Sequence, residues 1–519
     1  MPALQAMLQR LLRFEPYIFL LLLLAHVSVL FRFPWYPTLD GPAHLYNAHL
    51  IRQMMLGNEF LARYFEFSSF PEPNWSGHAI MAFLSLFLPA NWVEKGMVLT
   101  IFIGTAIAFR ALVFRYHRPT FATLLIFPFL CTFSLRIGFF NFSLSIAVFL
   151  AILAWWHGRT RSRAPTIDQG IFLCLLLGLL YFSHALTSVV CFGTLLLITI
   201  VQLKISNESV RIWKRSIGTL LIAMMPWTLL IILFILKAGN GTAATYQSAA
   251  RLLSIAMDGV PFTLHYGPAM IWAARTMAII LIAGSAWLIV HRWRWSRHRL
   301  IATDIWLLLS VGAAGAYAIM PDQAATGGII SVRYLQFMYL FLAIWLAVQR
   351  EWPVVMHLLI APYLLASLYL VRVDHGFTRD LNADVVAVRT MLPHIADDSA
   401  VLPLVHSKYW FHGNISNYLG TERGILVLDN YEAMAPHFPL RWKEEHRPPP
   451  AERTFYNSDR PCITIDTLAA DMRLPLHHVF RWKHHLQATD SCTLELSRQL
   501  HAGFLHQRQG EAEMFTRLP

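Results

Sequence analysis

Residues 15–33 read EPYIFLLLLLAHVSVLFRF, and residues 40–47, a few positions later, read DGPAHLYN. The first stretch is close to the ~20 apolar residues that cross a bilayer as a helix. The second places an acidic residue, a helix-starting proline and a histidine just outside that helix. Two interpretations follow: Asp40 caps a helix that begins near Pro42, or Asp40 belongs to a site that meets a lipid-borne substrate.

The composition is that of a membrane protein. Hydrophobic residues make up 56% of the 519 residues and charged residues 14%, against roughly 25% charged in soluble domains. Repeated apolar runs predict a mainly α-helical, polytopic bundle, in which the chain must turn near His184. The stretch 78–94 is interrupted by Pro89, Asn91 and Glu94 and predicts an interfacial or re-entrant helix instead. We predict eleven spans, at residues 15–33, 97–115, 119–135, 138–157, 170–185, 187–203, 216–236, 268–290, 301–320, 331–349 and 353–372.

The distribution of charge predicts the orientation of these spans. Lys and Arg outnumber Asp and Glu by 27 to 12 in residues 1–373, whereas residues 374–519 hold 15 and 18. By the positive-inside rule, the basic short loops and the N-terminus face the cytoplasm. An odd number of spans then puts the C-terminus outside the plasma (inner) membrane. The net charge of +12 is explained by topology, so we predict no nucleic-acid partner. The basic loops lie around residues 110–118, 159–163, 204–215 and 292–299.

Two domains are predicted. Residues 1–373 form the membrane domain, with residues 34–96 as a long first outer loop, and residues 374–519 form a small extracytoplasmic α/β domain. The second domain is long enough for one core of its own. Within it, we predict a helix at 380–395, strands at 400–405, 424–428 and 463–465, and an exposed loop at 441–453, which contains three consecutive prolines.

The cysteines agree with this topology. Cys131, Cys174 and Cys191 lie in apolar helices, where a thiol behaves as a small hydrophobe. Cys462 and Cys492 each open a strand-like segment of the outer domain, the second of which is residues 492–496. A disulfide between them and a pair of buried free thiols both fit the sequence.

The rare polar side chains of the spans gather at their outer ends. Charged groups at membrane depth are expensive and usually face a cavity or one another. The alternative is that the arginines extend to outer-leaflet headgroups. Because all these residues belong to one face, we predict a site for an anionic lipid headgroup. Its substrate-binding residues are predicted to be Asn47, Arg136, Asn141, His184, His265 and Arg333.

Asp40, His44 and Glu72 are the predicted catalytic residues. As a helix cap, Asp40 would contribute about 0.5–2 kcal/mol; as a general base, it would deprotonate an acceptor hydroxyl group. His44 and Asn47 share its helical face, which suits a base with an orienting partner or a pair of metal ligands. Glu72, between two prolines, is either a second acid or a loop charge. No second histidine or carboxylate stands at metal-ligand spacing, so we predict no metal ligands and no cofactor, leaving a divalent cation as the alternative.

Four short motifs carry a resemblance to a known family. They are residues 40–47, residues 138–142 (GFFNF), Gly327-Gly328 leading to Arg333, and residues 429–433 (DNYEA) shortly before residues 438–442 (FPLRW). With the inside N-terminus, the long first outer loop and the outward C-terminal domain, the chain resembles the GT-C superfamily of integral-membrane glycosyltransferases, and more narrowly a bacterial branch of it.

The resemblance implies a function. Such enzymes move a sugar from a polyprenyl-phosphate carrier to an acceptor on the non-cytoplasmic side. It implies Asp40 as general base and Arg333, with Arg136, as ligands of the lipid phosphate. We therefore expect an inverting membrane glycosyltransferase whose partners are a polyprenyl-phosphate-linked sugar, a glycan, lipid or protein acceptor, and membrane lipid. The alternatives are a non-catalytic component of envelope polysaccharide assembly and a transporter of lipid-linked glycans.

Overall fold

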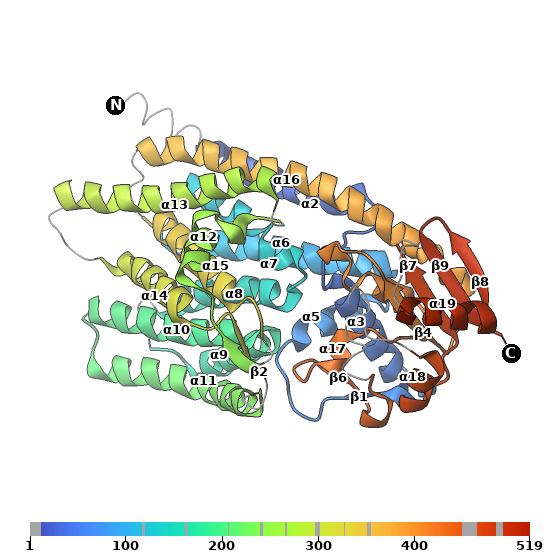
Figure 1. Cartoon of the computed structure of the whole chain (residues 1–519). Coiled ribbons are helices and arrows are strands. Elements are labelled where there is room, and N and C mark those ends of the chain that lie inside the picture. Colours follow the sequence, from blue (N-terminus) through green and yellow to red (C-terminus); the bar gives the residue numbers. More distant parts are fainter. Residues whose placement is uncertain are drawn as a thin grey trace. The chain divides into compact units, whose positions relative to one another are not determined.

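The structure is a computed structural model, shown in Figure 1. Its Cα positions group into two compact units. Unit 1 comprises Met1–Phe31, Leu99–Arg136 and Phe140–His375, and unit 2 comprises Arg32–Val98, Ile137–Phe139 and Gly376–Pro519. The segment predicted as the first outer loop and the C-terminal region thus belong to the same unit. The structure describes residues 12–116, 120–160, 164–205, 207–238, 242–264, 267–295, 301–325, 327–349, 354–448, 464–483 and 491–518.

Unit 1 is built from apolar helices (Figure 1). Among the described residues, nine helices are long and apolar enough to cross a membrane. The chain is a multi-pass membrane protein, as the sequence predicts. The helices are α2 (Glu15–Arg32), α6 (Ala90–Val113), η2 (Phe121–Phe129), α7 (Phe133–Arg136), α8 (Phe140–Thr160), α9 (Ile167–Ser183), α10 (Ala185–Ile205), α11 (Val210–Ala238), α12 (Ala249–Met257), α13 (Pro268–Trp295), α14 (Ile305–Ile319), α15 (Ile330–Ala347) and α16 (Val354–Arg389), with α6 beginning and α16 ending in unit 2.

Two of the eleven predicted spans coincide with shorter helices. The run at 119–135 forms η2, a 3-10 helix that contains Pro128, followed by the single turn α7. Proline lacks the N–H group that an α-helix needs in its interior, which explains why this run is not one continuous α-helix. The run at 170–185 forms α9, which has 17 residues. The predicted turn at His184 is confirmed, because this residue leaves helical geometry between α9 and α10.

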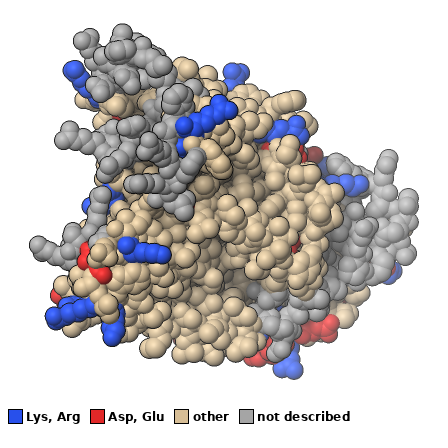
Figure 2. Space-filling view, turned by 90° about the vertical axis from the view of Figure 1, so that its left-hand side faces the viewer, with Lys and Arg blue, Asp and Glu red and all other residues tan. Residues whose placement is uncertain are grey.

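One end of the helical bundle carries more basic than acidic side chains. Figure 2 views the chain from the left-hand side of Figure 1, where the described ends of α10, α11 and α13 lie. Uncharged residues cover most of this face, and the Lys and Arg side chains are more numerous than Asp and Glu (Figure 2). The last turns of α10 and α13 contain Lys204, Arg292 and Arg294. This pattern suits the end of a bundle that faces anionic headgroups.

Unit 2 contains the predicted α/β domain. Its five-stranded sheet has the order β5-β4-β7-β9-β8, in which β4 is parallel to β5 and β7, and β9 is antiparallel to β7 and β8. The central part of the sheet is fully covered, since every residue of β4 and β7 is buried. The strands are β4 (Ser399–Val405), β5 (Ile425–Val427), β7 (His478–Trp482), β8 (Phe504–Gln509) and β9 (Ala512–Arg517), and the helices include α17 (Tyr431–Met434), α18 (Ile465–Asp471) and α19 (Ser491–Gly503).

Residues 34–96, which the sequence predicts to be the first outer loop, contribute to the core of this unit. The main helix of this segment, α3 (Gly41–Met55), is buried on all sides from Gly41 to Ile51. Tyr46 joins α3 to the sheet, because its hydroxyl group donates to Ile425 O at 2.7 Å and accepts from Val427 N at 3.0 Å. Farther along are α4 (Glu59–Tyr64), β1 (Phe65–Phe67) and α5 (Trp75–Leu84), and β1 pairs antiparallel with β6 (Leu440–Trp442) of the C-terminal region.

Three local predictions for the C-terminal region are wrong. Residues 492–496 lie in helix α19, where Glu495 accepts a hydrogen bond from Gln499 at 3.0 Å, a pair spaced by one helical turn. The described end of the predicted strand 463–465 opens helix α18. The predicted loop 441–453 begins inside β6, in which Trp442 is buried against Phe65. Cys462 and the Cys492 side chain lie outside the described residues, and the three other cysteines are free thiols.

Candidate active site

Asp40 occupies the N-cap position of α3, but its side chain does not cap the helix. The first N–H of the helix, that of Gly41, donates instead to the Thr38 hydroxyl oxygen at 2.9 Å. Pro42 lies in the first turn, where a missing N–H group is tolerated. Within α3, which is described throughout, the Asp40 carboxylate makes no capping hydrogen bond. The capping interpretation therefore does not explain this carboxylate.

The Asp40 carboxylate is instead oriented by the C-terminal region. Asn414 Nδ2 donates to Asp40 Oδ1 at 3.0 Å and also to Leu39 O at 3.1 Å. The Tyr431 hydroxyl group lies within hydrogen-bonding reach of the carboxylates of Asp40 and Glu432, and burial of that group together with both carboxylates raises the pKa of Tyr431. Asp40 remains partly exposed, whereas α3 directly after it is buried. An oriented, accessible carboxylate can accept a proton from a bound substrate.

The backbone at Ile137 and Gly138 packs against Asp40. The backbone N–H of Asp40 donates to Ile137 O at 3.2 Å. Gly138 has φ +86°, and a Cβ atom on it would lie 2.6 Å from Asp40 N and 2.8 Å from Asp40 Cβ. Only glycine combines that backbone conformation with so close an approach. The close approach of Asp40 therefore explains why a glycine, Gly138, occupies the first position of the motif GFFNF.

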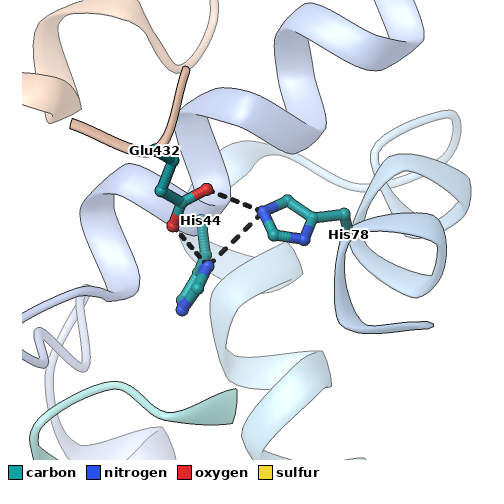
Figure 3. A group of neighbouring side chains, drawn as sticks. All are labelled: His44, His78 and Glu432. Carbon is teal, nitrogen blue, oxygen red and sulfur yellow. Dashed lines mark hydrogen bonds and ion pairs between the residues drawn. The ribbon is translucent and has the colours of Figure 1, made fainter. Parts of the chain in front are cut away.

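His44, one turn after Asp40, forms a buried cluster with His78 and Glu432 (Figure 3). His44 Nδ1 lies 2.5 Å from Glu432 Oε1, and His78 Nε2 lies 2.8 Å from Glu432 Oε2. Burial opposes a charge on His44, but the Glu432 carboxylate outweighs it and raises the pKa of His44. Burial likewise opposes the charge on Glu432, and the two imidazoles outweigh it and lower the pKa of Glu432 to about 2. These three residues could also hold a metal ion.

Asn47 positions the helix that carries Glu432. Its amide exchanges two hydrogen bonds with Asn430, at 2.8 and 3.0 Å. Asn430 in turn caps α17, since its side chain accepts from Ala433 N. The Asn47 amide is thereby committed to holding α17, with Tyr431 and Glu432, next to α3. The structure thus shows Asn47 in contact with Asn430, and its predicted role in substrate binding stays a prediction.

Glu72 is held in a different set of contacts. It is fully buried and forms an ion pair with Arg441 at 2.6 Å, while Ser68 donates to it at 3.1 Å. Arg441 also donates to Pro436 O at 2.8 Å, close to the end of α17. The pair links the β1–α5 connection to β6. Of the three predicted catalytic residues, Asp40 and His44 contact residues of α17, and Glu72 pairs with Arg441 of β6.

The predicted binding residues of unit 1 form two groups. Arg333 Nη1 donates to His184 Nε2 at 3.1 Å, and the guanidinium group lies over the Phe142 ring, 5.5 Å from its centroid. Both Arg333 and His184 are partly exposed. Arg136, in contrast, is buried and pairs with the buried carboxylate of Asp374 at 3.5 Å. Asn141 is buried at the start of α8, and His265 lies outside the described residues.

Sequence analysis missed four residues of the group around Asp40: His78, Asn414, Tyr431 and Glu432. The segment 429–433 was singled out as a motif, but nothing in the sequence linked it to Asp40. Glu432 lies 354 residues after His78. No second histidine or carboxylate stands near His44 at metal-ligand spacing, and the fold supplies both from distant segments.

Comparisons with known proteins identify the fold. No protein-family model matches the sequence, and no curated protein matches it either. Among solved structures, the chain is similar to ArnT from Cupriavidus metallidurans bound to undecaprenyl phosphate. That similarity covers 97% of both chains, with a TM-score of 0.53 and 10% sequence identity. The predicted GT-C-like fold is therefore confirmed over nearly the whole chain.

Proposed function

We propose that this chain is a membrane glycosyltransferase that moves a sugar from a polyprenyl-phosphate donor to an acceptor outside the cytoplasm, with Asp40 as general base. The observation that carries the proposal is Asp40, a partly exposed residue whose carboxylate does not cap its helix and is oriented by Asn414 and Tyr431. The similarity to a protein solved with undecaprenyl phosphate supports a lipid-linked donor.

The proposed reaction needs one proton acceptor and one leaving group. Asp40 takes the proton of an acceptor hydroxyl group while that oxygen attacks the anomeric carbon of the donor sugar. The bond between the anomeric carbon and the phosphate oxygen breaks, and its electron pair leaves with polyprenyl phosphate. Attack opposite the leaving group inverts the anomeric configuration. The acceptor is a hydroxyl group of a glycan, lipid or protein.

Arg333 is the proposed ligand of the lipid phosphate. Arg333 is partly exposed, and its guanidinium group is oriented by His184 and Phe142. A planar guanidinium can bind two phosphate oxygens at once. Arg136 is less suited to this role, because its side chain is buried against Asp374.

We expect Arg333→Ala to weaken binding of undecaprenyl phosphate by about 10- to 100-fold, since hydrogen bonds to charged groups contribute about 1.5–3 kcal/mol. Arg333→Lys should recover only part of the affinity, because lysine lacks the planar fork. Titrations of purified variants with the lipid measure the dissociation constants. Arg372→Ala, at an exposed arginine on α16, is the control. An unchanged constant in Arg333→Ala would remove this residue from the phosphate site.

We also propose that residues 374–519 lie outside the cytoplasm, in the orientation that the basic loops favour. A C-terminal alkaline phosphatase fusion is expected to be active, and a fluorescent reporter that matures only in the cytoplasm should stay dark at the same position. The opposite pair of results would reverse the orientation and exclude a donor site on the outer side.

The function itself is tested by turnover. The purified full chain is incubated with a pool of polyprenyl-phosphate-linked sugars and an acceptor extract, and mass spectrometry follows the lipids. We expect free polyprenyl phosphate to accumulate beyond one equivalent per protein molecule, because a catalyst acts repeatedly. Donor that stays bound but intact would instead support the non-catalytic role in polysaccharide assembly.

A further inference from the structure

His44, His78 and Glu432 lie close enough together to bind one metal ion. The Glu432 oxygens are at hydrogen-bond distances of 2.5 and 2.8 Å from the two imidazoles and would have to move away by roughly 0.5–0.8 Å to become zinc ligands. The three side chains come from α3, α5 and α17 and point toward one another (Figure 3). His44 Nδ1 and His78 Nε2 lie 3.4 Å apart. Two nitrogens that bind one tetrahedral zinc ion through bonds of about 2.0–2.1 Å lie roughly 3.3 Å from each other. One ligand atom from each residue lies within 4.8 Å of the others.

Each of the two histidines has one ring nitrogen that faces away from the cluster and hydrogen-bonds with a backbone carbonyl. The other ring nitrogen can therefore present its lone pair to the cluster. His78 Nδ1 lies 3.0 Å from Asn74 O. A carbonyl oxygen only accepts, so this nitrogen carries the hydrogen and a neutral His78 presents the lone pair of Nε2 to the cluster. His44 also hydrogen-bonds with a backbone carbonyl, that of Gly138. A backbone carbonyl behind each imidazole is the usual support of a metal-binding histidine.

The ring nitrogens of His44 and His78 and the carboxylate of Glu432 need a proton or a metal ion between them. With both imidazoles neutral, two lone pairs and a carboxylate face one another at 2.5 to 3.4 Å in a buried place. A proton on an imidazole or a metal ion can satisfy them. Protons on both imidazoles would satisfy the carboxylate through two hydrogen bonds, and a metal ion would satisfy all three groups at once. The separation of 3.4 Å between the two ring nitrogens, which is that of two ligands of one ion, points to the metal.

We propose that His44, His78 and Glu432 bind a zinc ion. Two imidazole nitrogens and one carboxylate oxygen are a common ligand set for zinc, whereas calcium and magnesium prefer oxygen ligands alone. The Phe438 ring packs edge-on against both imidazoles, with centroid distances of 6.0 and 5.7 Å, and provides an apolar wall. Three protein ligands leave a fourth position for water.

The ion would hold together the parts that orient Asp40. It would tie α3, on which Asp40 and His44 lie one turn apart, to α5 and to α17. Tyr431, next to Glu432 on α17, reaches both carboxylates. The zinc site would therefore have a positioning role. The proposal is independent of glycosyl transfer, since it concerns binding of a metal by the folded chain.

Metal analysis of the full chain, purified in detergent without chelators, tests the proposal. We expect about one zinc ion per chain, and close to none in His78→Ala and in Glu432→Gln, which keeps the size of the side chain. His49→Gln is the matched control, because His49 is equally buried on α3 but does not belong to the cluster. Zinc that stays at one ion per chain in both cluster variants would place the metal elsewhere and overturn the proposal.

A second measurement does not depend on variant folding. The wild-type chain is treated with a chelator, dialysed and titrated with zinc or with cobalt. We expect the melting temperature to fall by several degrees without metal and to return with zinc, and cobalt to show the visible absorption bands of a tetrahedral site. Absence of zinc in the purified chain, with neither a cobalt band nor a shift in melting temperature, would show that a proton bridges the cluster.

Discussion

Asp40→Asn is expected to lower the rate of sugar transfer by roughly 10²–10⁴-fold, the usual contribution of general acid–base catalysis. Asparagine has nearly the size of aspartate, and its carbonyl oxygen can still accept the hydrogen bond from Asn414. The start of the helix is unaffected, because the native Asp40 side chain makes no capping hydrogen bond and Thr38 still accepts from Gly41 N. Only the proton-accepting carboxylate is lost. The melting temperature should therefore change by little, and initial rates at saturating donor measure the effect.

Two further variants separate chemistry from folding. Asp380→Asn removes an exposed carboxylate of the same unit and is expected to leave the rate unchanged. Asp40→Ala should be as slow as Asp40→Asn and fold as well, since the native side chain does not cap α3. If Asp40→Asn transferred sugar at the wild-type rate, Asp40 would have no part in proton transfer, and the non-catalytic function would be favoured.

Gly138→Ala is expected to lower the rate about 10²-fold, because misplacing a catalytic group by ~1 Å has an effect of this order. The added Cβ would meet Asp40 N at 2.6 Å, so the turn or the start of α3 must move. The positive φ of +86° adds strain, about 1–2 kcal/mol for a residue other than glycine. We therefore expect a melting temperature lower by a few degrees and a loss that falls on kcat more than on KM.

Gly376→Ala is the control for this variant. It lies in α16 within unit 2, and an added Cβ would meet none of the described atoms within 4 Å. Alanine is favoured over glycine in a helix, so this change should preserve both rate and stability. A Gly138→Ala chain with the wild-type kcat would show that the position of Asp40 does not limit the reaction.

The helical part of the fold could be predicted because its signal is local. A run of about 20 apolar residues is sufficient to indicate a span, and the turn at His184 followed from the length of the run around it. The helix type of η2 could not be predicted in this way, because hydropathy does not distinguish a 3-10 helix around Pro128 from an α-helix. The five residues 492–496 alternate like a strand, but the helix that contains them extends to Gly503. Residues after 496, including Gln499, decide its geometry.

The site could be predicted only in part, for a related reason. Asp40 and His44 were predicted together because one short segment contains both. Their partners Asn414, Tyr431 and Glu432 come from the far end of the chain, and a single sequence holds no signal that pairs them. Asn47 shares the helical face of Asp40, as predicted, but its amide is committed to Asn430. Spacing along a helix gives the direction of a side chain, not the identity of the neighbour that the fold brings to it.

The most direct test of Asp40 as general base is chemical rescue of Asp40→Ala by formate. Asp40 is partly exposed, so a small carboxylate can enter the space that the side chain leaves. We predict that transfer by this variant rises with formate concentration, while the wild-type rate does not respond. Transfer by Asp40→Ala at the wild-type rate without formate would contradict the account, because the reaction would then need no carboxylate at this position.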